Sequence, residues 1–298
     1  MHPLLKPLSE QVIVLTGASS GIGLATAQLA AEHGARLVLL SRSGEVLQSL
    51  VDMLEDDGHE AILVVADVGR REVVERAARQ ALKHFGRIDT WVNNAGVPID
   101  GHLHEVSEAD HRRLFDTHFR GVVNGSRVAL PLLGREGGAL INVGGEVSDA
   151  VVPLQGMDSA SKHAVKGFTD ALRVQVEGVG KAPVSITLIQ PTVVDTPFPQ
   201  RARNSTDREP KLPSPRIDPV EVARAILHAA VSGGRDVRVG MRTTLHATAP
   251  QPMPGRADRR SARQARRPHF DQLPADPQDT LHCAGAAGHI HGERPVLH

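Results

Sequence analysis

Short apolar runs rich in β-branched residues alternate with amphipathic stretches along most of this chain. The runs lie at Val12–Leu15, Leu37–Leu40, Ile62–Ala66, Ile88–Val92, Leu140–Val143, Val184–Ile189 and Val237–Val239. Runs that are apolar on both faces are typical of buried strands in a parallel sheet. Between them apolar residues recur every three or four positions, as at Ala160, Ala164, Phe168 and Leu172, which predicts helices. The pattern predicts an α/β fold with a single doubly wound parallel sheet.

The alternation ends near residue 242. Residues 243–298 are rich in Pro, Arg, His and Gly, poor in aliphatic residues and without a sustained period. We therefore expect one domain at 1–242 and a tail at 243–298 that is disordered or covers a partner subunit. Six arginines lie within residues 256–267, and a solvated tail is favoured there over a site for phosphates or an acidic surface.

The tail also contains residue types that ligate metals, namely His282, Cys283, His289 and His291. Their spacing fits no standard zinc pattern, so no metal site is predicted.

Composition limits the classes of partner. Lys and Arg total 34, as do Asp and Glu, so the net charge of zero favours neither nucleic acid nor an anionic membrane. No apolar run approaches the roughly 20 residues that span a bilayer, and the start of the chain lacks a signal-peptide pattern. The single cysteine suits a reducing compartment. We expect a cytoplasmic protein with a small-molecule ligand.

A glycine-rich turn, TGASSGIG at 16–23, follows the first predicted strand and precedes a predicted helix. Gly17, Gly21 and Gly23 allow a tight turn, close approach of a ligand to the backbone, and close packing of helix on sheet. The free N–H groups at the helix start would bind a pyrophosphate. The overlapping G-x-S-x-G pattern of hydrolases is the weaker alternative, because that motif follows a central strand and does not need Gly23.

The second predicted strand is followed by Ser41 and Arg42. An acidic residue at this place binds the ribose hydroxyls of NAD, whereas a basic residue accommodates the 2′-phosphate of NADP. Arg42 therefore favours NADP over NAD, and a solvent-facing arginine is the alternative.

Four spaced motifs together resemble the short-chain dehydrogenase/reductase family over residues 8–240: TGASSGIG, Asp67-Val68, the NNAG at 93–96, and SASKHAVKGFTDALR at 159–173. The resemblance implies a Rossmann sheet of about seven strands, a nicotinamide dinucleotide, and a homodimer or homotetramer. It implies coenzyme contacts from Gly17, Ser19, Ser20, Gly21, Ile22, Gly23, Ser41, Arg42, Asp67, Val68, Asn94, Ala95, Gly96, Lys162 and Thr196.

The family's catalytic set contains an asparagine, a serine, a tyrosine and a lysine, and only the lysine, Lys162, is present. The tyrosine position is Asp158, the serine position is Gly145 and the asparagine position is His118; the chain contains no tyrosine at all.

These replacements remove the groups that carbonyl reduction requires. Tyrosine delivers a proton because a neighbouring lysine lowers its pKa toward neutrality. We expect the same lysine to lower the pKa of Asp158 from its usual value of about 3.9, leaving no proton to donate at neutral pH. Gly145 offers no hydroxyl to the carbonyl oxygen, and losing one such donor typically costs about 10²–10³ in rate.

Other roles for these residues are possible from the sequence. His118 could act as the acid with Asp158 orienting it, and Ser159 with Lys162 matches the S-x-x-K pattern of acyl transfer. Asp158 and Lys162 could also form an ordinary ion pair on one face of a helix. His163 is expected to point away from the cleft.

Two functions follow. The first is an oxidoreductase that transfers hydride between NADP(H) and a carbonyl or alcohol substrate with very weak activity. The alternative is a non-catalytic dinucleotide-binding protein that acts through its oligomer surface or its tail.

Overall fold

The computed structural model describes residues 5–240, apart from 153, 181, 207 and 211–214, together with 270–274, 279–285 and 288–292. Seven parallel strands form one sheet in the order β10-β7-β6-β4-β1-β2-β3. In chain order they are β1 (Val12–Thr16), β2 (Arg36–Ser41), β3 (Ala61–Val65), β4 (Thr90–Asn93), β6 (Gly138–Val143), β7 (Val184–Pro191) and β10 (Asp236–Val239). The predicted doubly wound parallel sheet is confirmed.

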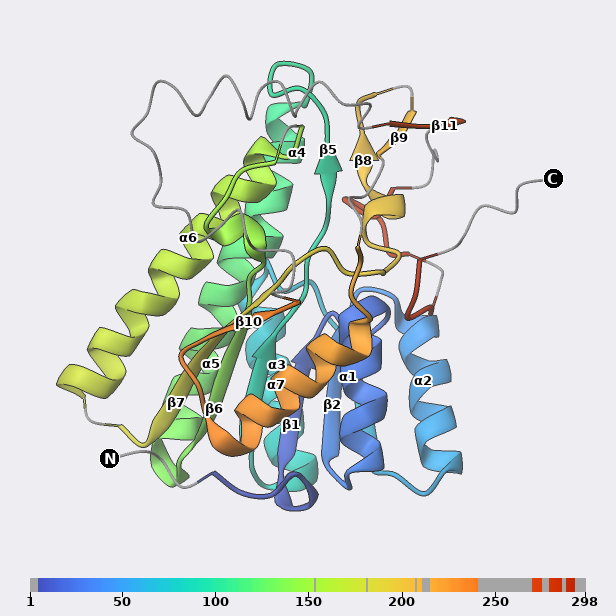
Figure 1. Cartoon of the computed structure of the whole chain (residues 1–298). Coiled ribbons are helices and arrows are strands. Elements are labelled where there is room, and N and C mark those ends of the chain that lie inside the picture. Colours follow the sequence, from blue (N-terminus) through green and yellow to red (C-terminus); the bar gives the residue numbers. More distant parts are fainter. Residues whose placement is uncertain are drawn as a thin grey trace.

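Helices cover both faces of this sheet (Figure 1). They are α1 (Gly21–Glu32), α2 (Gly44–Asp56), α3 (Arg71–Phe85), α4 (Glu108–Phe115), α5 (Gly121–Glu136), α6 (Gly156–Arg173) and α7 (Pro219–Ser232). Helices α1, α2 and α7 pack on one face, and α3 and α5 pack on the other with the end of α6. A π-helical turn at Asp116–Arg120 joins α4 to α5 without a break in the helical backbone.

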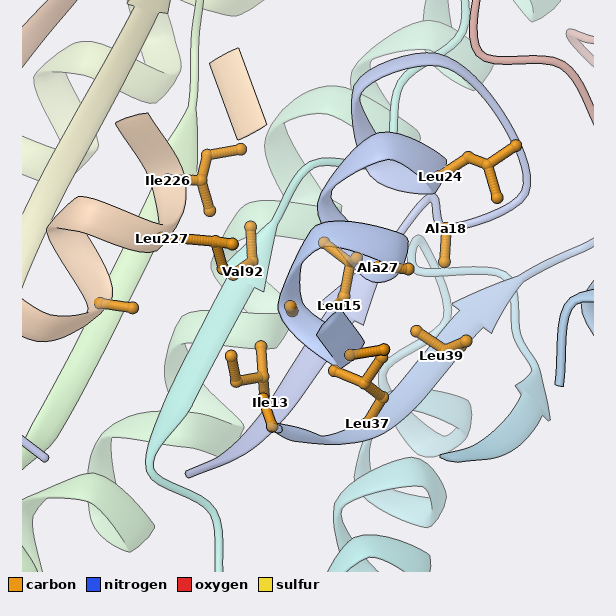
Figure 2. Close-up of a cluster of buried hydrophobic side chains, with 14 of the residues drawn as sticks. Ile13, Leu15, Ala18, Leu24, Ala27, Leu37, Leu39, Val92, Ile226 and Leu227 are labelled. Carbon is orange, nitrogen blue, oxygen red and sulfur yellow. The ribbon is translucent and has the colours of Figure 1, made fainter. Parts of the chain in front are cut away.

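Side chains alternate between the two faces along each strand, as the pleat requires. Ile13 and Leu15 of β1 lie in the core with α1, α2 and α7, whereas Val12 and Val14 lie in the opposite core with α3 and α5. Figure 2 shows the first of these cores, in which Ile226 of α7 lies near Val92 of β4. Aliphatic side chains fill both cores almost alone, and Trp91 is the largest fully buried residue.

The strand order reverses at β1, which pairs with β2 on one side and β4 on the other. In open α/β sheets, ligands bind outside the carboxyl ends of the strands at such a point. Beyond the main sheet lie two small pairs, β5 (Ile99–Asp100) with β8 (Arg203–Asn204), and β9 (Arg208–Pro210) with β11 (Phe270–Pro274). Figure 1 places β5, β8 and α4 together beyond one end of the sheet.

Most of the predicted tail, including the arginine-rich residues 256–267, lies outside the described residues. The described part includes residues 279–285 and 288–292, here called the C-terminal segment. Leu281 of this segment is fully buried in a small cluster with Val97, Ile99 and Leu114. Within the described part of the chain, no helix is long and apolar enough to cross a membrane.

Candidate functional site

A cleft of about 850 Å³ lies along the carboxyl ends of the strands. The predicted residues that line it are Gly17, Ser19, Ser20, Gly21, Ile22, Ser41, Arg42, Asp67, Val68, Asn94, Ala95, Gly96, Gly145, Asp158, Lys162 and Thr196. Residues far apart in the sequence therefore meet, because most of them follow the end of a strand or lie near the start of a helix. Gly23 and His118 are absent from the lining and lie behind it.

The glycine-rich turn depends on the absence of side chains at two positions. Gly17 has φ +72°, and a Cβ there would stand 2.8 Å from the backbone of Ala95. A Cβ on Gly23 would stand 2.0 Å from the carbonyl oxygen of Gly17, so helix α1 can approach the turn only with glycine at this place. The turn thus presents the N-terminus of α1 toward the cleft, a geometry suited to a phosphate group.

Asn94, at the end of β4, fixes the same turn from the other side. Its side-chain amide donates to Thr16 O at 3.0 Å and to Gly17 O at 3.3 Å. Its backbone N–H donates to Thr16 Oγ1 at 2.9 Å. The NNAG motif therefore holds the glycine turn against β4 and also borders the cleft.

At the other end of the cleft, Asp67 follows β3 and Arg42 follows β2. Asp67 Oδ1 accepts a hydrogen bond from Gly69 N at 3.0 Å, and its Oδ2 pairs with Arg113 Nη1 at 2.7 Å. Arg42 donates from Nη1 to Leu281 O at 2.9 Å and from Nη2 to Thr280 O. Arg42 thus borders the cleft as predicted, but the C-terminal segment occupies its guanidinium.

The C-terminal segment makes further contacts around the glycine turn. Ser43 Oγ donates to Gly285 O at 2.7 Å, and Gly21 N donates to His289 O at 2.9 Å. A carbonyl of the segment therefore takes one of the N–H groups at the start of α1. This contact was not predictable from the sequence, because backbone carbonyls make it and every residue carries one.

The tail residues considered as metal ligands are all described. His282 Nε2 lies 2.6 Å from Asp110 Oδ1, and Cys283 is exposed. Among the described residues, no three His, Cys, Asp or Glu side chains lie together in a way that could hold a metal ion.

Lys162 and Asp158 lie on α6 and border the opposite half of the cleft. Lys162 Nζ donates to Val143 O at 3.2 Å, and burial lowers its pKa while Asp158 raises it. Asp158 is 8 % exposed, and its Oδ1 has no hydrogen-bond partner among the described residues. The charges of the two side chains influence each other's pKa, but the two side chains do not form an ion pair with each other.

The expectation that Lys162 lowers the pKa of Asp158 is wrong in its net direction. Burial raises the pKa of Asp158 to about 6, and the attraction of Lys162 only partly opposes that rise. The sequence argument counted the neighbouring cation and omitted desolvation, which disfavours the charged form of a buried carboxyl.

His118 is fully buried in the π-helical turn. Its Nε2 accepts from Val97 N at 2.9 Å, which places the ring proton on Nδ1, 2.9 Å from Ser161 Oγ and 3.5 Å from Asp158 Oδ1. Burial, together with the charge of Lys162, lowers the pKa of His118 well below its usual value. A neutral imidazole that does not border the cleft is unsuited to act as the acid, contrary to the role considered from the sequence.

Gly145 lies in extended backbone at φ 166°, in the loop after β6. A Cβ at this position would meet its nearest neighbour, a Val147 methyl, at 3.5 Å, which is ordinary contact. A serine would fit here, so the glycine is not required by the backbone. His163 also behaves as predicted: its Nδ1 lies 2.8 Å from Ser159 O, away from the cleft lining.

Sequence reasoning missed Asp100, which ends β5 and borders the cleft near Asp158. It is 2 % exposed; its Oδ1 accepts from Gln155 Nε2 at 2.9 Å, and its Oδ2 has no partner among the described residues. Burial raises its pKa to about 6, the Gln155 hydrogen bond lowers it, and the charge of Asp158 raises it further. A lone acidic residue within the apolar stretch VPID was the signal available in the sequence.

Comparison with known proteins gives a consistent match. Residues 11–207 match the family model described as short chain dehydrogenase. The uncharacterized oxidoreductase YxnA of Bacillus subtilis is 42 % identical over 293 residues, covering 97 % of this chain and 82 % of that protein. An uncharacterized oxidoreductase of Staphylococcus aureus is 32 % identical over 223 residues, covering 74 % of this chain and 91 % of that protein.

Two solved structures share this fold. A short chain dehydrogenase/reductase from Burkholderia phymatum in complex with NAD is 27 % identical with a TM-score of 0.74, covering 90 % of this chain and 99 % of the other. An alcohol dehydrogenase from Thermococcus sibiricus complexed with 5-hydroxy-NADP is 26 % identical with a TM-score of 0.67, covering 81 % and 98 %.

Proposed function

The chain belongs to the short-chain dehydrogenase family, and on that premise we propose that it binds a nicotinamide dinucleotide in the cleft at the carboxyl ends of the strands. The observation that carries this proposal is the glycine turn, where added Cβ atoms at Gly17 and Gly23 would collide with backbone and Asn94 locks the turn in place. Such a turn at the N-terminus of α1 fits a pyrophosphate. Bound there, the dinucleotide would supply hydride-transfer chemistry.

The residues along the cleft suggest how the coenzyme would be held. Asp67 and Val68 would flank the adenine, Asn94, Ala95 and Gly96 would line the middle of the cleft, and Thr196 with Lys162 would contact the nicotinamide end. Arg42 at the end of β2 favours NADP, since a guanidinium binds a phosphate well. The hydrogen bonds from Arg42 to the C-terminal segment oppose that preference, because the 2′-phosphate of NADP competes with those carbonyls.

For the chemical step we propose an oxidoreductase with very weak turnover of carbonyl or alcohol substrates. Gly145 supplies no hydroxyl, and the short side chain of Asp158 lies well behind the place that a tyrosine hydroxyl would reach. Lys162 keeps its position near Val143 and remains available to the coenzyme. The alternative is a non-catalytic dinucleotide-binding protein that acts through a homodimer or homotetramer surface or through the tail.

A fluorescence titration with NADPH and NADH, followed by assays of aldehydes and ketones, tests the proposal. We expect saturable binding of at least one dinucleotide and carbonyl turnover far below 1 s⁻¹, a rate at the low end of ordinary enzymes. Absence of binding for both dinucleotides contradicts the proposal. Turnover above about 1 s⁻¹ with a ketone contradicts the loss of the catalytic set while leaving coenzyme binding intact.

A further inference from the structure

Two buried carboxyl groups border the substrate half of the cleft, and among the described residues each has one oxygen without a hydrogen-bond partner. These atoms are Asp100 Oδ2 and Asp158 Oδ1, and the two residues are 2 % and 8 % exposed. A buried carboxylate without compensation is unfavourable, so proteins normally pair or neutralise it. The described residues leave this pair incompletely compensated.

The neighbouring groups do not supply the missing partner. Lys162 Nζ donates to Val143 O, Gln155 satisfies only Asp100 Oδ1, and the proton of His118 points to Ser161. The charged residues that border the whole cleft are Arg42, Asp67, Asp100, Glu146, Asp158, Lys162 and Arg201. Of these, Arg42 and Asp67 lie at the far end and are paired there.

The rest of the same half of the cleft is apolar. Val147, Val151, Val152, Leu154 and Phe198 border it, and three of them are exposed to the cleft or solvent: Val151 by 78 %, Val152 by 37 % and Phe198 by 39 %. A ligand for this place combines an apolar skeleton with a cationic group that two neighbouring carboxylates attract.

We propose that the substrate half of the cleft binds a small organic molecule carrying a cationic nitrogen, held by Asp100 and Asp158, and that the natural hydride acceptor is a protonated imine. The first part stands on the two carboxyl groups alone. The second part rests on the dinucleotide binding proposed above.

The replaced catalytic positions fit this substrate class better than a carbonyl. Reduction of a carbonyl creates an alkoxide, which needs hydroxyl donors and a proton. A protonated imine already carries positive charge: hydride from the reduced dinucleotide forms the new C–H bond, the C=N π electrons move to nitrogen, and a neutral amine results without proton delivery. Carboxylates stabilise that cation, so Asp158 in place of a tyrosine and Gly145 in place of a serine are then suitable.

The binding part is tested without coenzyme, by isothermal titration of the full chain with pyrrolidine, a cyclic amine that is protonated at neutral pH, and with cyclopentanol as its neutral analogue. We expect saturable binding of pyrrolidine and none of cyclopentanol. Asp100→Asn and Asp158→Asn should each weaken pyrrolidine binding at least tenfold, since each removes a charge-assisted hydrogen bond. Asp52→Asn, the same change at an exposed site on α2, should leave it unaltered.

The pH dependence provides a second readout. The pKa values of both carboxyls lie at about 6, so the anionic forms that bind the cation are present above pH 6 and are lost as the pH falls through it. Pyrrolidine affinity should therefore fall about tenfold between pH 7.5 and pH 5. Equal affinity at both pH values, or equal affinity in the two Asn variants and wild type, overturns the proposed cation site.

The reaction is tested by following NADPH oxidation with 2-methyl-1-pyrroline and with cyclopentanone. We expect the imine to react at least tenfold faster, and Asp158→Asn to remove most of that difference, whereas Asp52→Asn should leave it intact. Equal rates for imine and ketone overturn the imine assignment. If NADPH fails to bind, the proposed function and the hydride step fail together, whereas the pyrrolidine titration still decides the cation site.

Discussion

The two halves of one cleft differ in how fully they agree with the family resemblance. Of the coenzyme contacts that the family resemblance implies, all but Gly23 line the cleft, from Gly17 to Arg42 and Asn94. The substrate half contains Lys162, and by the family resemblance Asp158, Gly145 and His118 stand at the positions of its three expected partners. The first half is built around backbone geometry that the glycine turn requires, whereas the second depends on individual side chains, among them the buried His118 and Asp158.

His118 illustrates how little the fold depends on the replaced groups. It stands at the position that the resemblance assigns to the family's asparagine, and both of its ring nitrogens have partners, Val97 N and Ser161 Oγ. Gly145 leaves room for a serine, and Asp158 begins a helix whose N-terminus tolerates an acidic side chain. None of the three replacements therefore disturbs the sheet or its cores.

The largest effect should come from restoring the substrate half. Combining Gly145→Ser, His118→Asn and Asp158→Tyr returns a hydroxyl donor and a phenol beside Lys162, each typically contributing about 10²–10⁴ in rate. We expect ketone reduction with NADPH to rise at least 10³-fold over the wild type. The measurement is the steady-state rate with a panel of ketones.

The same triple variant should lose pyrrolidine binding, since it removes Asp158. One protein would then show both the gain of ketone reduction and the loss of the cation site. Single changes should recover little, because residues that act as a unit are strongly non-additive. A triple variant that binds NADPH normally but gains no ketone activity would contradict the view that only the catalytic set is altered.

A second prediction concerns a substitution in the glycine turn of the coenzyme half. Gly23→Ala places a Cβ 2.0 Å from Gly17 O and 2.8 Å from Asn94 Nδ2, so the turn or α1 must shift. We expect the dissociation constant for NADPH to rise at least 100-fold by fluorescence titration, with a lower midpoint of thermal unfolding. Gly167→Ala is the control, since its Cβ meets nothing within 4 Å on helix α6. That change should instead stabilise the protein by about 0.5–1 kcal/mol.

The fold was predictable from the sequence because strands and helices follow a periodic pattern that the sheet requires. The glycine turn was also predictable, since glycines such as Gly17 and Gly23 indicate backbone geometry directly. The state of Asp158 was not, because its pKa depends on burial that only the packed structure reveals. Nor was Asp100, whose approach to Asp158 depends on where the short strand β5 lies.

A third prediction concerns the stability cost of the substrate half. The folded-state pKa of Asp158, about 6, exceeds its ordinary value of 3.8. Its ionisation therefore costs no stability below pH 4, begins to cost as the pH rises, and costs up to about 3 kcal/mol above pH 6. Asp158→Asn escapes this cost, so its free energy of unfolding should exceed that of the wild type by more at pH 7.5 than at pH 4.5.

Urea denaturation at the two pH values measures this difference. Asp52→Asn serves as the control, because it makes the same change at an exposed carboxyl of α2. An equal gain in the free energy of unfolding for Asp158→Asn at both pH values would mean that ionisation of this carboxyl does not destabilise the fold. The substrate half would then carry no stability cost.

The smallest expected effect is on coenzyme preference, where the C-terminal segment contacts the otherwise intact half. Leu281 is fully buried and anchors the carbonyls that accept from Arg42. Leu281→Ala removes buried apolar contacts and should loosen the segment, freeing Arg42 for the 2′-phosphate of NADP. We expect NADPH to bind about three- to tenfold more tightly and NADH to change less, as measured by fluorescence titration. Leu103→Ala, the same change at an exposed site, should alter the affinity for neither coenzyme.

A double variant separates two ways in which the segment could act. In an Arg42→Ala background the effect of Leu281→Ala on NADPH affinity should vanish, because the arginine that would bind the phosphate is then missing. If tightening persists without Arg42, the segment acts by obstructing the glycine turn through His289 O rather than by holding the arginine.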